Sequence, residues 1–176
     1  MEPLTWGFIG TLVGTVVGAS ASILTTIINA RNVSRNQNRL EIYKRQEIFR
    51  EFQRDNYLKI QERTYKAHRL VSLLYVQDLQ NLKDNGQWQQ GILNAENSNE
   101  LLFTVQDLLM YLERIQNEKL REEIRNLTGK MLRVSHTSDL KESNQLLTEI
   151  HVDISSAMKI LGTELRNNYY SADVTY

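Results

Sequence analysis

The feature that most restricts the fold is an uncharged run over residues 4–30. At about 1.5 Å per residue, a helix over this run would be roughly 40 Å long and could cross a hydrocarbon layer of about 30 Å. Soluble domains seldom contain uncharged runs of this length, because their helices keep one polar face toward water. The sequence therefore predicts a transmembrane helix within residues 1–30.

Small residues recur at every fourth position of this run and would lie along one side of the helix. They are Gly10, Gly14, Gly18, Ser22 and Thr26. Small side chains let a second helix backbone approach closely, and such packing drives helix association in lipid. We expect a helix–helix interface here, with a second copy of the chain or with another membrane protein. The alternative interpretation is that glycine is simply frequent in membrane helices.

Basic residues follow the apolar run directly, whereas the only charged residue before it is Glu2. The basic residues nearest the run are Arg31, Arg35, Arg39, Lys44 and Arg45. By the positive-inside rule, this flank lies in the cytoplasm and the N-terminus lies outside the inner membrane. We expect these side chains to reach the lipid headgroups. A cleaved signal peptide is an alternative, because Ala-Ser-Ala at 19–21 resembles a cleavage site, but the basic leading segment of signal peptides is missing.

The remaining chain has no proline and reads as almost entirely helical. Asn85 and Gly86 predict the end of the first long helix, and packing is expected to become firm from about Ala67. After this helix, Trp88 and Ile92 are expected to fold back on the bundle, and Asn97 with Glu100 is expected to cap the next helix. The predicted fold is all-α: the transmembrane helix continues into a long stem helix and a three- or four-helix cytoplasmic bundle. The predicted parts are an anchor (1–30), a basic stem (31–66), a helical bundle (67–166) and a polar tail (167–176).

The formal net charge is zero, but the charges are unevenly distributed. Residues 31–69 carry about twice as many basic as acidic side chains, and the remainder carries an excess of acidic ones. A basic segment beside the membrane suits anionic lipid headgroups. Because acidic residues are interleaved with the basic ones, nucleic acid is not an expected partner. The chain has no cysteine, which excludes disulfides and thiol chemistry.

No phosphate-binding loop, dinucleotide fingerprint or metalloprotease motif is present in the sequence. A transition-metal site would require His68, His136 and His151 to converge, and nothing in their spacing indicates that they do. We therefore expect no metal, no cofactor and no enzymatic activity.

One short motif points to catalysis. Residues 63–68, with Arg63 and His68 at the ends, resemble the Arg-x4-His pattern of HEPN ribonucleases, which are helical bundles. The resemblance implies RNA cleavage by such a pair brought together across a dimer. That family favours Asn, Asp or His after the arginine, where this chain has Thr64. The alternative is that both residues belong to a solvated stem.

Two further hypotheses concern the whole chain. One is an oligomeric scaffold that presents the bundle to a cytoplasmic protein. The other is a membrane effector that senses a cytoplasmic signal, such as a nucleotide, in an antiviral or stress response. The glycine-rich anchor and the arginine-studded helix over residues 1–60 resemble small bacterial single-pass membrane proteins, some of them associated with phage defence. This resemblance of layout implies no particular activity.

Overall fold

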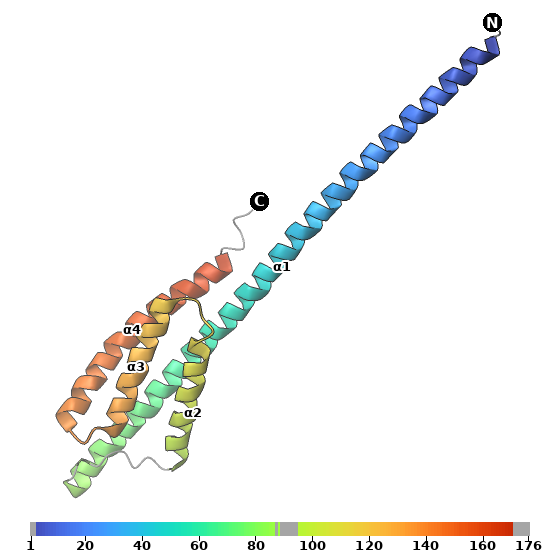
Figure 1. Ribbon diagram of the computed structural model, residues 1–176. Helices are drawn as coiled ribbons and strands as arrows, with labels where there is room; N and C mark the ends of the chain where they lie inside the picture. Colours follow the sequence, from blue (N-terminus) through green and yellow to red (C-terminus); the bar gives the residue numbers. More distant parts are fainter. Residues whose placement is uncertain (1–2, 87, 89–94, 171–176) are drawn as a thin grey trace. The chain divides into compact units, whose positions relative to one another are not determined.

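The computed structural model describes residues 3–86, 88 and 95–170, and in those ranges it contains four α-helices and no strand (Figure 1). The helices are α1 (Pro3–Asn85), α2 (Ala95–Leu112), α3 (Glu118–His136) and α4 (Leu140–Tyr170). The predicted all-α fold is confirmed. The anchor and the stem belong to one helix, because α1 continues without a break through both.

The helix ends follow from local chemistry. Gly86 ends α1 with a positive φ of 69°, and its N–H donates to the Leu82 carbonyl over 2.9 Å, as expected for a glycine after a helix. Asn117 caps α3 by accepting a hydrogen bond from the Leu120 N–H at 2.9 Å. Asp139 does the same for α4 by accepting from the Lys141 N–H at 2.8 Å.

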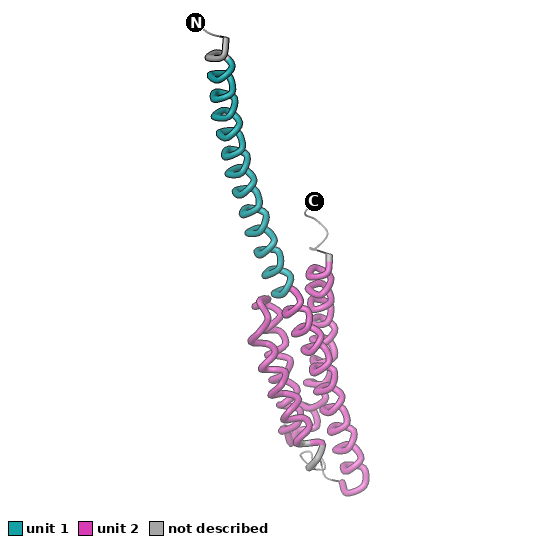
Figure 2. The backbone as a smooth tube through the Cα atoms, turned by 90° about the vertical axis from the view of Figure 1, so that its right-hand side faces the viewer, with its two compact units in different colours: residues 1–49 teal, residues 50–176 magenta. Residues whose placement is uncertain are grey.

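The chain divides into two compact units, residues 1–49 and residues 50–176 (Figure 2). The first unit is helical throughout its described part, and each of residues 7–49 is exposed. This helix is long and apolar enough to span a membrane.

The second unit is a four-helix bundle in which successive helices run antiparallel (Figure 1). Its core consists of two hydrophobic clusters, and every helix contributes to both. One cluster comprises Ala67, Leu70, Val71, Leu74, Leu101, Val105, Leu127, Met131, Val134, Leu146, Ile150 and Ile154. The other comprises Tyr57, Ile60, Leu108, Leu112, Ile115, Leu120, Ile124, Ala157 and Leu161. Helices that are apolar on one face stabilise each other in this way.

The buried part of α1 begins at Gln53, upstream of the position near Ala67 where firm packing was expected. Gln53 is 3% exposed; its side-chain N–H donates to the Arg114 carbonyl at 2.9 Å and its carbonyl oxygen accepts from the Gln116 N–H at 3.2 Å. These two hydrogen bonds join α1 to the segment between α2 and α3. A polar side chain can therefore begin the core, since its hydrogen-bonding groups are satisfied inside it.

Three further expectations concern the ends of the bundle helices. Trp88 was expected to fold back on the bundle, and its indole N–H donates to the Thr137 carbonyl at 3.3 Å. Ile92, with the same expectation, lies outside the described residues. The expectation that Asn97 caps the second helix is wrong, because α2 begins at Ala95. The polar tail was expected to start at 167, but α4 continues to Tyr170.

Candidate functional site

The small residues of the anchor form a surface that other groups can approach. Apart from the adjacent residues and the backbone of its own helix turn, a methyl group placed on Gly10, Gly14 or Gly18 would meet no atom within 4 Å. The apolar side chains around them are all exposed, including Phe8, Leu12, Val13, Val16, Val17, Ile23 and Leu24. This segment therefore needs lipid or another helix to cover it.

Five hydroxyl groups of the anchor donate hydrogen bonds inside the helix. Thr26 donates to the carbonyl of Ser22 at 2.8 Å, and Thr11, Thr15, Ser20 and Thr25 each donate to the carbonyl four residues earlier. A hydroxyl bonded in this way adds no unsatisfied donor to a lipid environment. The predicted interface residue Thr26 thus presents mainly its methyl group to a neighbour.

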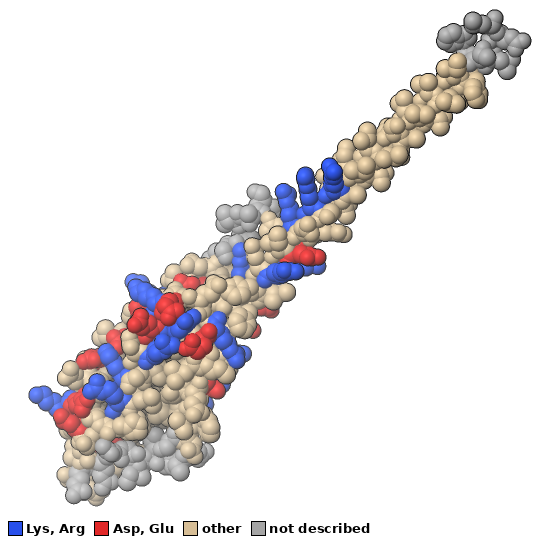
Figure 3. Space-filling model, viewed as in Figure 1, with Lys and Arg blue, Asp and Glu red and all other residues tan. Residues whose placement is uncertain are grey.

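The predicted headgroup-binding residues lie immediately after the apolar segment. In Figure 3, charged side chains are absent from the visible N-terminal part of α1 among the described residues, and basic ones begin partway along it. Arg45 lies 3.9 Å from Glu41. Arg31, Arg35, Arg39 and Lys44 have no ion-pair partner in the described part of the chain, so their charges remain free to contact an external anion.

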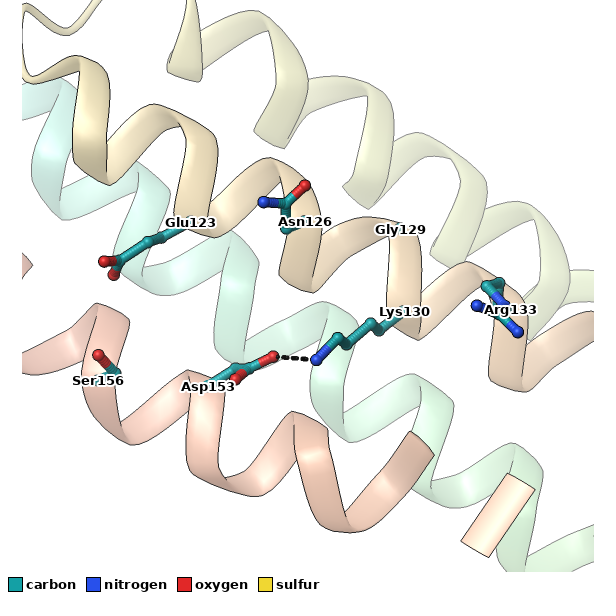
Figure 4. Close-up of a pocket in the computed structure, with 7 residues that line it drawn as sticks. All are labelled: Glu123, Asn126, Gly129, Lys130, Arg133, Asp153 and Ser156. Atoms are coloured by element: carbon teal, nitrogen blue, oxygen red, sulfur yellow. Dashed lines mark hydrogen bonds and ion pairs between the residues drawn. The ribbon is translucent and has the colours of Figure 1, made fainter. Parts of the chain in front are cut away.

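A groove between α3 and α4 is lined by charged side chains from both helices (Figure 4). Lys130 of α3 points toward α4, where its ammonium group contacts Asp153 at 2.8 Å and Glu149 at 2.9 Å. Hydrogen bonds to these carboxylates raise the pKa of Lys130, and the bond from Lys130 lowers the pKa of Glu149. A lysine that stays protonated is a poor nucleophile or base. The arrangement therefore favours a structural role for Lys130, in which its ion pairs hold α3 against α4.

A second groove, between α1 and α2, also contains paired charges. Arg63 lies 3.4 Å from Asp107, and Lys66 lies 2.8 Å from Glu100. Phe103 lines the same groove and is 63% exposed. The cations in this groove bind the neighbouring helix, as the lysine of the α3–α4 groove does.

The Arg-x4-His motif is not assembled into one site within the chain. Arg63 contacts Asp107 of α2, whereas the His68 ring contacts the His151 ring of α4. The two motif residues thus face different helices. This geometry gives no support to a ribonuclease centre formed by one chain.

Sequence reasoning missed two features of the bundle that bring distant residues together. Tyr57 and Glu164 interact across the core, where burial and the carboxylate raise the pKa of Tyr57 to about 12. His68 and His151 meet, although their spacing gave no reason to expect it. The periodic apolar residues of each helix show which of its faces is directed toward the core. They do not show how far one helix is shifted along its neighbour, so the sequence could not indicate these pairs.

Comparison of the chain with protein-family models, with curated proteins and with solved structures found no match.

Proposed function

We propose that the protein is a membrane-anchored scaffold that associates through the small-residue face of its anchor and presents a helical bundle to a cytoplasmic partner. The observation that carries the proposal is that every one of residues 7–49 is exposed, although this range includes an uncharged apolar segment. Apolar side chains exposed around a whole helix are stable only when lipid or other helices cover them.

The charge pattern supports the orientation of the anchor. The basic residues that follow it are those expected at an inner-membrane surface facing the cytoplasm, where anionic lipids attract Lys and Arg by about 1 kcal/mol each. In this arrangement the bundle lies in the cytoplasm and the N-terminus outside it.

The small-residue face supports association between anchors. Gly10, Gly14 and Gly18 leave the backbone open over two successive turns of helix, and a neighbouring backbone can pack there. Pairing the anchors would also bring together stems whose Leu40, Tyr43 and Phe49 are exposed in the single chain.

The outer face of α2 supports binding of a protein partner. Leu102, Phe103, Leu109 and Met110 are exposed and lie on one side of this helix. Clusters of exposed apolar side chains on a folded domain are typical of protein contact surfaces.

A substitution pair tests the anchor interface. Gly18→Leu should reduce cross-linking between anchors in membranes, because the leucine side chain fills the space that a partner backbone would occupy. Ser20→Leu is the matched control, since it also introduces leucine but lies about 200° around the helix. Equal cross-linking in the two variants would refute the interface.

The effector hypothesis predicts a different result when the anchor variants are expressed in cells. Expression of an effector that rearranges its anchors should be toxic to cells, and the toxicity should disappear in Gly14→Leu and Gly18→Leu. A harmless protein whose cross-linking is nevertheless lost in Gly18→Leu supports the scaffold.

A further inference from the structure

Two of the three histidines meet across the bundle, one on α1 and one on α4. The ring centres of His68 and His151 are 5.1 Å apart, and the ring planes cross at 84°. In the described part of the chain no third His, Asp or Glu completes a group of three metal ligands here. The pair therefore has to be considered as two ligands.

The hydrogen bonding of His151 fixes which of its nitrogens is available. Its Nδ1 lies 3.0 Å from the Leu147 carbonyl, and because a carbonyl only accepts, Nδ1 must carry the hydrogen. In the neutral ring the lone pair is then on Nε2. Histidines that bind metals are commonly oriented in this way, by donating their other N–H to a backbone carbonyl.

The environment of His68 leaves one of its nitrogens without a partner. Its Nε2 is buried and makes no hydrogen bond with any described residue. Neutral imidazole is the form that binds a metal ion.

We propose that His68 and His151 together bind a divalent transition-metal ion such as Zn²⁺ and thereby join α1 to α4. With Zn–N bonds of about 2.0–2.1 Å, two imidazoles on one tetrahedral ion place their ring centres roughly 5 Å apart, which matches the observed separation. Water would occupy the remaining positions. Such a site links helices and binds more weakly than sites with three or four protein ligands.

The test is titration of the full-length chain, without a histidine tag, with ZnCl₂ in detergent near neutral pH by calorimetry. The expected result is one zinc ion per chain, with affinity reduced at least tenfold in His151→Ala. His151 is exposed, so this variant should fold normally. His136→Ala is the matched control and should bind zinc like the unmodified chain, which has only three histidines and no cysteine.

Thermal unfolding provides a second measurement. Zinc should raise the melting temperature of the unmodified chain and of His136→Ala, because a ligand that binds only the folded state stabilises it, and it should leave His151→Ala unchanged. Absence of saturable binding, equal binding by His151→Ala, or loss of binding in His136→Ala would overturn the proposal. An increase in molecular mass on adding zinc would also overturn it, since the metal would then join chains instead of helices.

Discussion

Replacing Ile60 by alanine tests where the bundle begins. Ile60 is fully buried and contributes to the core cluster that includes Leu108 and Ile124, although it lies in the segment that the sequence assigned to the stem. Truncating a buried isoleucine to alanine costs about 2–5 kcal/mol, because it removes apolar contacts and leaves a cavity. A loss of about 3 kcal/mol is a large part of the roughly 5–15 kcal/mol that stabilises a typical domain.

The assay is thermal unfolding of the intact chain in detergent, followed by circular dichroism, in which the membrane helix contributes a constant background. With roughly 4 °C per kcal/mol for a domain of this size, Ile60→Ala should lower the bundle's melting temperature by about 12 °C. Leu58→Ala is the control, because Leu58 is 47% exposed and its truncation should change stability by no more than about 0.5 kcal/mol. Equal melting temperatures for the two variants would refute a core that begins upstream of Ala67.

Three other predictions use the same unfolding assay. Gln53→Ala should destabilise the bundle by about 1–3 kcal/mol, because it removes the two hydrogen bonds that join α1 to the segment between α2 and α3; a loss below about 0.5 kcal/mol would contradict this role. The pKa of His68, which faces His151 of α4, is lowered in the folded state, so the unfolded chain binds more protons and stability should decrease as the pH falls below 6.5. His68→Phe should lack this part of the pH dependence, and an unchanged pH profile of stability in that variant would argue against the prediction. Phe103→Ser should leave the melting temperature within about 2 °C of the unmodified value, because the ring is 63% exposed, and a large decrease would show that the outer face of α2 is structural.

Much of the fold could be predicted from the sequence because its signals are local. The end of α1 at Asn85 and Gly86 depends on glycine's access to positive φ, which one residue encodes. The apolar face of α3 is similarly evident from Leu120, Ile124 and Met131.

The upstream start of the core could not be predicted, because polar residues occupy it. Gln53, Asn56 and Thr64 are buried, and they interrupt the apolar pattern that marks a core in the sequence. Thr64 donates to the Ile60 carbonyl at 2.7 Å and Asn56 to the Phe52 carbonyl at 2.7 Å, so both are satisfied within α1. Their burial becomes evident only when the neighbouring helices are in place.

The candidate sites also differ in how far the sequence could predict them. The small-residue stripe from Gly10 to Thr26 is periodic and could be identified from spacing alone, and its role as an interface stays a prediction. The His68–His151 pair and the contact of Lys130 with Asp153 join residues from different helices. Such pairs depend on how far each helix is shifted along its neighbour, and apolar periodicity leaves that shift open.

The most direct test of the account is the molecular mass of the intact protein in detergent, measured by light scattering beside that of residues 31–176 alone. The account predicts that the intact chain is an oligomer and that the fragment, which lacks the anchor, is a monomer. Monomers in both samples would contradict association through Gly10, Gly14 and Gly18 and would leave that face to a different membrane protein. The same oligomer in both samples would also contradict it, since assembly would then not require the anchor.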